Sequence, residues 1–275
     1  MRRTSATLLI AALSVAPVLT GCQKIEARQA LKSGNSFYLD ERYREAIVEY
    51  QRGLQLDPSA TFAWRSVGLS AMALYRPGLD TPDNKKFAAT AIDAFQKYLA
   101  AYPDDQKVAE YLITTLIGSE RYDDALARLK AEAQQHPDRV ELQSMIVTTT
   151  IRAGRLDEAY SYAKGLGSRA DATAFYAVGV ACWDKSYHDP MLDPVARGKV
   201  VDTGLEAIKK AIDMRPDYFE AMAYYNLLFR EKAKLETDPL KAQEWYAKAE
   251  DWTKKAIAVR DAQKAKEAAK AAAGT

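Results

Sequence analysis

Side chains suited to catalysis or metal binding are few in this chain. Its 275 residues include two cysteines, Cys22 and Cys182, and two histidines, His136 and His188. Two cysteines are too few for a disulfide framework or a cysteine-rich zinc site, and two histidines leave little for a histidine-based catalytic centre. We expect His136 to cap a helix at the surface and Cys182 to pack as a small buried residue. Metal binding by His188 and redox chemistry at Cys182 are the alternatives, but we predict no metal and no cofactor.

Two pairs of adjacent aspartates offer another chemistry, general acid–base catalysis. They are Asp104-Asp105 and Asp123-Asp124. Both pairs stand where helices are expected to begin, and acidic side chains there oppose the helix dipole. Phosphate-binding glycine loops, zinc-protease helices, nucleophile elbows and CxxC pairs are absent from the sequence. We therefore predict a protein that is not an enzyme and has no catalytic residues.

The charge balance argues against a nucleic-acid partner. The chain has 39 basic and 37 acidic residues, a formal net charge of +2, whereas nucleic-acid binding usually needs a basic surface. The hydrophobic fraction of 48% and the charged fraction of 28% are typical of a globular protein.

The N-terminus has the pattern of an export signal. Arg2 and Arg3 precede a mostly apolar stretch, residues 6–20, that ends in small residues. This stretch is too short to span a bilayer and is interrupted by Ser14 and Pro17. Residues 1–21 are therefore predicted to be a signal peptide. Without Arg2 and Arg3 the basic and acidic counts are equal.

The sequence Leu19-Thr20-Gly21-Cys22 resembles the lipobox of bacterial lipoproteins. The resemblance implies cleavage before Cys22 and lipid attached to its thiol, with residues 22–26 as an anchor linker. Gln23 follows the cysteine where an aspartate would imply retention at the inner membrane. The expected location is thus the cell envelope, at the outer membrane and facing the periplasm. An ordinary signal peptide is the alternative.

Beyond the signal, the chain repeats one pattern. A small residue recurs at spacings of 45, 34, 34, 45 and 45 residues. These positions are Ala46, Ala91, Ala125, Ala159, Gly204 and Ala249. Four of them are followed, twelve residues later, by a proline, which cannot continue a helix. An unrelated helical bundle would not explain this period.

A period of 34 residues and its signature positions resemble the tetratricopeptide repeat, a helix–turn–helix unit. The first two units carry the clearest set: Gly34, Phe37, Ala46, Tyr50, Gly53 and Pro58, then Trp64, Gly68, Ala91, Phe95 and Pro103. The fourth unit is the weakest, with Asp171 where proline is expected. The resemblance implies an all-α fold, a right-handed α-solenoid of about six units. Their predicted bounds are 27–60, 61–105, 106–139, 140–171, 172–218 and 219–260.

Three units are longer by eleven residues, about three helical turns, and are predicted to have extended hairpins. The extra residues are 75–83, 186–193 and 232–238. Each long hairpin is expected to have a helix that starts with a capping residue followed by proline: Thr81-Pro82, Asp193-Pro194 and Asp238-Pro239. The extensions serve hairpin geometry or form a ridge that contacts a partner. Residues 261–275, rich in alanine and lysine, are predicted to be a frayed extension of the last helix.

In tetratricopeptide families the first helix of each pair lines a concave groove, so the resemblance also implies a partner-binding surface. The positions that correspond here are Leu31, Asn35, Tyr38, Phe62, Arg65, Leu69, Met72, Lys107, Glu110, Tyr176 and Trp183. This mixture of aromatic, apolar and charged side chains suits a protein segment. Packing against the next helix is the alternative role for each of them.

The sequence therefore predicts a non-catalytic scaffold, anchored to the membrane through Cys22, that gathers other envelope proteins or peptide segments. The alternative function is a ligand-binding component of an envelope uptake system, since 16 tyrosines and 4 tryptophans offer surfaces for stacking.

Overall fold

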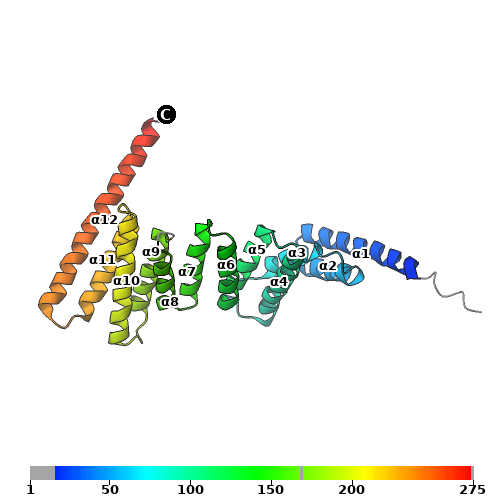
Figure 1. The fold of residues 1–275 in the computed structure, drawn as a ribbon, viewed down its shortest axis with the longest axis horizontal. Coiled ribbons are helices and arrows are strands. Elements are labelled where there is room, and N and C mark those ends of the chain that lie inside the picture. Colours follow the sequence, from blue (N-terminus) through cyan, green and yellow to red (C-terminus); the bar gives the residue numbers. More distant parts are fainter. Residues whose placement is uncertain (1–15, 168–169, 274–275) are drawn as a thin grey trace, which may run out of the picture. The chain divides into compact units, whose positions relative to one another are not determined.

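A computed structural model describes residues 16–167 and 170–273 (Figure 1). Within these ranges the chain forms α-helices and no strand. The helices are α1 (Ala16–Leu39), α2 (Tyr43–Leu56), α3 (Ala63–Leu74), α4 (Pro82–Ala101), α5 (Gln106–Gly118), α6 (Tyr122–Gln135), α7 (Val140–Arg152), α8 (Leu156–Gly165), α9 (Ala172–His188), α10 (Pro194–Met214), α11 (Phe219–Leu235) and α12 (Pro239–Ala273). The all-α class predicted from the sequence is confirmed. Most of the predicted signal peptide lies outside the described residues.

The helices belong to two compact units, residues 1–121 and residues 122–275. The boundary falls inside the third predicted repeat, 106–139, so that α5 belongs to the first unit and α6 to the second. In the first unit α1 packs on α2 and α3 packs on α4, with α2 against α3 and α4 against α5.

In the second unit α7 packs on α8, α9 on α10, and α11 on α12. Figure 1 shows these pairs as antiparallel hairpins joined by short turns. Helix α9 also contacts both α7 and α11, so the first helices of consecutive hairpins are neighbours. This is the arrangement that gives helical repeats a continuous face of first helices.

The small residues that define the period lie where helices meet. All six, Ala46, Ala91, Ala125, Ala159, Gly204 and Ala249, are buried. A side chain larger than alanine at such a contact would push the helices apart, because protein interiors are close-packed. The hairpins with buried small residues at a fixed period define an all-α helical-repeat fold.

The three long hairpins use their extra residues in different ways. In the first, α3 ends at Leu74 and the segment before Pro82 contains Pro77 and Gly78, which break the helix. In the fifth and sixth units, α9 and α11 instead run on as helix to His188 and Leu235. Parts of the predicted inserts 186–193 and 232–238 therefore continue α9 and α11 as helix.

The predicted caps at the end of each insert are present. The Thr81 hydroxyl accepts a hydrogen bond from the Asn84 amide, at 3.3 Å. Asp193 accepts from the amides of Val195 and Ala196, at 2.9 and 3.0 Å. Asp238 likewise accepts from the Leu240 amide, at 2.9 Å. Each side chain satisfies backbone donors that the first helical turn leaves open.

Helices α1 and α12 both extend beyond the predicted repeat region, residues 27–260. Helix α1 begins at Ala16 and continues through residues 22–26, which were expected to be a linker. Cys22 lies exposed on this helix. At the other end α12 continues as helix to Ala273, so the tail from residue 261 extends the last helix. Among the described residues, no helix has both the length and the apolar character needed to cross a membrane.

Candidate interaction surface on the first helices

The predicted surface residues of α1 contribute mainly to their own hairpin. Leu31 packs over Gly53 of α2, and a β-carbon on Gly53 would lie 2.6 Å from Leu31 Cδ2. Asn35 is exposed but accepts a hydrogen bond from the Tyr50 hydroxyl, at 2.8 Å. Tyr38 packs edge-on against another tyrosine ring. Packing within the hairpin, the alternative role, therefore accounts for much of what these three side chains do.

The α3 residues leave more surface free. Phe62, just before α3, is 58% exposed, and Arg65 one turn later is also exposed. Leu69 and Met72 continue the same face and are half-buried. The spacing of three and four residues places all four side chains along one side of the helix. This face combines an exposed aromatic ring with a cation and apolar side chains.

The α5 residues form a local ion pair. Lys107 and Glu110 are exposed, and Lys107 Nζ lies 3.2 Å from Glu110 Oε2. The same ammonium lies 5.2 Å from the centroid of the Tyr111 ring. Exposed pairs of this kind contribute little to stability, so both charges are available to a partner.

In the second unit the predicted residues Tyr176 and Trp183 belong to a larger aromatic group. Tyr176 lies between Tyr218 and Tyr224, with ring centroids 4.9 and 5.7 Å away. Trp183 lies between Tyr224 and Tyr187, at 5.4 and 5.3 Å. The five rings thus form a chain of contacts, Tyr218–Tyr176–Tyr224–Trp183–Tyr187, which we call the aromatic row.

The row joins two neighbouring first helices. Helix α9 supplies Tyr176, Trp183 and Tyr187, α11 supplies Tyr224, and Tyr218 is the residue before α11. Sequence reasoning missed Tyr218, Tyr224 and Tyr187. The spacing along α9 could have added Tyr187, because it lies four residues beyond Trp183 on the same face. The other two rings join the row only through the contact between helices.

Four of the five rings remain partly or largely open to solvent. Tyr187 is 55% exposed, Tyr176, Trp183 and Tyr224 are half-buried, and Tyr218 is buried. Burial, with the neighbouring Tyr224, Tyr218 and Glu220, raises the pKa of Tyr176 to about 12. Its hydroxyl therefore stays protonated at neutral pH and can donate a hydrogen bond.

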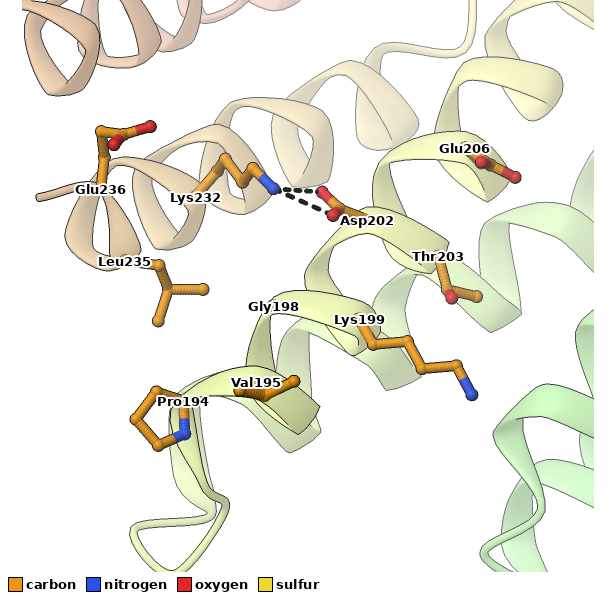
Figure 2. Close-up of a pocket in the computed structure, with 10 residues that line it drawn as sticks. All are labelled: Pro194, Val195, Gly198, Lys199, Asp202, Thr203, Glu206, Lys232, Leu235 and Glu236. Carbon is orange, nitrogen blue, oxygen red and sulfur yellow. Dashed lines mark hydrogen bonds and ion pairs between the residues drawn. The ribbon is translucent and has the colours of Figure 1, made fainter. Parts of the chain in front are cut away.

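A separate pocket of about 610 Å³ lies between α10 and the end of α11 (Figure 2). Its charged side chains already have partners within the protein. Lys232 Nζ lies 2.7 and 2.9 Å from the two carboxylate oxygens of Asp202, as Figure 2 shows. Lys199 lies 2.9 Å from Asp157 Oδ2. Because these charges are neutralised internally, they offer little for recognising an ionic ligand.

The carboxylates of Glu206 and Glu236 in this pocket also have hydrogen-bond partners within the protein. The Tyr160 hydroxyl donates to Glu206 Oε2 at 2.9 Å. Burial and this hydrogen bond raise the pKa of Tyr160 well above its usual value. The Glu236 carboxylate accepts from the amides of Thr237 and Asp238. The pocket is therefore a consequence of hairpin packing, and the aromatic row lies outside it.

The residues first considered for chemistry have structural contacts. Cys182 is fully buried on α9, as expected. His188 Nδ1 lies 3.0 Å from Asp184 Oδ1. The Asp105 side chain caps α5 by accepting from the Val108 amide at 3.1 Å. Within the part of the chain that the structure describes, no group of three or more metal-ligating side chains comes together.

Comparisons with known proteins gave matches among solved structures. No family model matches the chain, and no curated protein matches it. Among solved structures, it is similar to YrrB, a TPR protein with an unusual peptide-binding site, at 23% identity over 77% of this chain and 97% of that one, with a TM-score of 0.43. A TPR repeats protein from Bacteroides fragilis is 14% identical over 74% and 97% of the two chains, with a TM-score of 0.46. MamA is 19% identical over 71% and 92%, with a TM-score of 0.41.

Proposed function

We propose that this protein is a scaffold of the bacterial cell envelope, anchored to the membrane by lipid on Cys22, which holds other proteins through the faces of its first helices. The observation that carries the proposal is the aromatic row. Aromatic side chains that remain solvent-accessible on a rigid helical face are typical of protein-binding surfaces.

The first unit supports the same function with a second surface. Phe62 and Arg65 are exposed on successive turns at the start of α3. Phenylalanine and arginine are both enriched where proteins bind one another, because each presents a large contact area with a defined geometry. Each unit thus offers a surface of its own to a partner.

Anchoring is supported by the position of Cys22. Its side chain is exposed, and the first buried residue after it is Ala27. A lipid on Cys22 would therefore meet no packing conflict with the first hairpin. Two or three acyl chains are sufficient to hold a protein on a membrane, because each buried methylene contributes ~0.8 kcal/mol. With Gln23 after the cysteine, we place the protein at the outer membrane, facing the periplasm.

Crosslinking in intact cells tests the scaffold function. A tagged protein is crosslinked, purified with its lipid, and its partners are identified by mass spectrometry. We expect envelope proteins to be captured, and the double variant Phe62→Ala with Arg65→Ala to lose part of them. Capture of no protein above the level of an untagged strain would reject the scaffold function.

Fractionation of the same cells tests the anchor. The wild-type chain is expected in the membrane fraction and Cys22→Ser in the soluble periplasmic fraction or unprocessed. A Ser33→Ala variant is the control, since Ser33 is an exposed residue of α1 outside the lipobox. Equal membrane association of wild type and Cys22→Ser, with normal removal of the signal, would reject lipid anchoring.

A further inference from the structure

The aromatic row has cations of this chain over its two terminal rings. The guanidinium carbon of Arg215 lies 3.3 Å from the centroid of Tyr218. At the other end, Lys234 Nζ lies 5.2 Å from the centroid of Tyr187. Over the three middle rings, no lysine or arginine among the described residues takes such a position. Aromatic faces carry partial negative charge and attract ammonium and guanidinium groups within about 6 Å.

Acidic side chains lie near both ends of the row. Glu220 lies close enough to contribute to the raised pKa values of Tyr176 and Tyr218. Asp171 lies near Tyr218 as well. Near the other end, Asp184 follows Trp183 on α9 and is exposed.

The cations of the row do not balance these acids. Lys234 is already paired with Glu231, at 2.6 Å. Of the two cations over the terminal rings, Arg215 is therefore the one whose charge is not used in an ion pair with a described residue. Asp184 pairs only with His188, and Glu220 has no ion pair with any residue that the structure describes. Three acids, Asp171, Glu220 and Asp184, thus lie near a row whose middle rings have no cation of the described chain over them.

We infer that the aromatic row binds an extended peptide segment through lysine or arginine side chains that lie over its middle rings. This inference rests on the proposed scaffold function and names the chemistry of the partner. The acids attract the basic segment, and the rings hold its cations at short range.

The spacing of the rings fits an extended chain. Successive centroids are 4.9, 5.7, 5.4 and 5.3 Å apart. Alternate side chains of an extended strand point the same way and are roughly 6.6 Å apart. Basic residues at alternate positions can therefore reach neighbouring rings.

Calorimetric titration of the full chain carrying Cys22→Ser, purified in detergent, tests the inference. The probe is a short capped peptide in which lysine and threonine alternate, and its matched control has glutamine in place of each lysine. We expect the lysine peptide to bind about tenfold more tightly, and its affinity to fall as salt is added. Equal binding of the two peptides would overturn the inference, as would tighter binding of a neutral proline-rich peptide or an oligosaccharide.

Variants of the row locate the binding. Trp183→Leu with Tyr187→Leu is expected to reduce affinity for the lysine peptide about tenfold, and Tyr187→Leu alone, at an exposed position, by a smaller factor. Glu220→Gln with Asp184→Asn is expected to weaken binding and to reduce its salt dependence. Tyr246→Leu, an exposed aromatic on α12 outside the row, is the matched control and should bind as wild type. Unchanged affinity in Tyr187→Leu and in a row double variant that keeps its helical circular dichroism would overturn the inference.

The crosslinking experiment separates this inference from the scaffold function. If wild type captures envelope proteins and the row variants capture the same set, the scaffold stands and the inference fails. If wild type captures none, the scaffold function itself fails, whatever the peptides do.

Discussion

The ring of Phe95 on α4 lies directly against the α-carbon of Gly68 on α3, so that a β-carbon on Gly68 would overlap the ring edge. Phe95 is fully buried. The first hairpin repeats the relationship, because a β-carbon on Gly34 would lie 2.7 Å from the Tyr50 ring. In each of these hairpins, a glycine on the first helix thus lets a large ring on the second helix pack closely against it.

The first prediction concerns this contact. Gly68→Ala is expected to lower the free energy of unfolding by about 1–2 kcal/mol, because overpacking outweighs the gain in helix propensity. Gly198→Ala is the control, since Gly198 is also helical but has no neighbouring atom within 4 Å of the point where a β-carbon would lie. That control should raise the free energy of unfolding by about 0.5–1 kcal/mol. Urea unfolding followed by circular dichroism measures both, and stabilisation by Gly68→Ala would contradict the packing argument.

The second prediction concerns the long turn before α4, which is held by one side chain. Asn84 is 4% exposed, accepts from the Arg76 amide at 2.8 Å, and donates to the carbonyls of Arg76 and Leu79 at 2.8 and 2.7 Å. Asn84→Ala removes all three hydrogen bonds and is expected to cost about 2 kcal/mol of unfolding free energy. Urea unfolding measures the loss, and limited proteolysis should show faster cleavage between residues 75 and 81.

The neighbouring Asp83 offers a matched control. It forms an exposed ion pair with Arg44 at 3.2 Å, and such pairs are worth about 0.5 kcal/mol. Asp83→Ala should therefore change stability and cleavage much less than Asn84→Ala. If both variants behave alike, the hydrogen bonds of Asn84 do not hold the turn.

The periodic features of the fold could be predicted from the sequence because they depend on local rules. A small residue before a proline at fixed spacing specifies a helix and its end, and Asp193-Pro194 specifies a helix start. Whether the inserted residues form a loop or continue a helix was harder to predict. Pro77 and Gly78 make one insert a loop, whereas Ser186 and Tyr187 continue α9, since no breaker precedes Pro190.

The candidate surface was predictable only in part, for a related reason. The positions of Tyr176 and Trp183 within the repeat identified them as residues of the first-helix face. Repeat register did not identify Tyr224, because that ring reaches the row through the packing of α11 on α9. Register also placed Leu31 on the surface, but its side chain packs onto Gly53 because glycine leaves space there. Contacts between helices thus decide which side chains remain exposed to solvent. The residue pattern of a single helix does not reveal these contacts.

The third prediction is that the contribution of Asp105 to stability is lost at acidic pH. Burial would raise the pKa of this carboxyl, but hydrogen bonds from the Val108 amide and the Tyr98 hydroxyl, at 3.1 and 2.9 Å, lower it below the usual 3.8. A lowered pKa in the folded chain means that the stabilisation is present above the usual pKa and is lost as pH falls through the lowered value. Asp105→Ala should therefore cost about 1 kcal/mol at pH 7 and progressively less below about pH 4.

Urea unfolding at several pH values measures this difference. Asp104→Ala is the control, because Asp104 is exposed and its side chain makes no capping hydrogen bond. Its effect should be small and should not vary with pH. A difference between wild type and Asp105→Ala that is constant from pH 7 to acid would show that the charge of Asp105 is not the source of its contribution.

The last prediction concerns the thiol of Cys182, which lies between α9 and α10. A β-carbon on Gly204 would lie 2.8 Å from Cys182 Cβ, and burial, followed by the charge of Asp157, raises the pKa of this thiol to about 12. At pH 8 only about one thiol in ten thousand is then ionised, and the thiolate is the reactive form. In the Cys22→Ser chain, iodoacetamide should leave Cys182 unmodified until urea unfolds the protein.

Because the usual thiol pKa is 9.0, the Cys182 thiol ionises at a lower pH in the unfolded chain than in the folded one. The free energy of unfolding is therefore also expected to fall between about pH 9 and pH 12. Cys182→Ala with Cys22 retained and unlipidated is the control, in which the exposed Cys22 should react in the folded protein. Rapid modification of Cys182 before unfolding would show that α9 and α10 open at this contact.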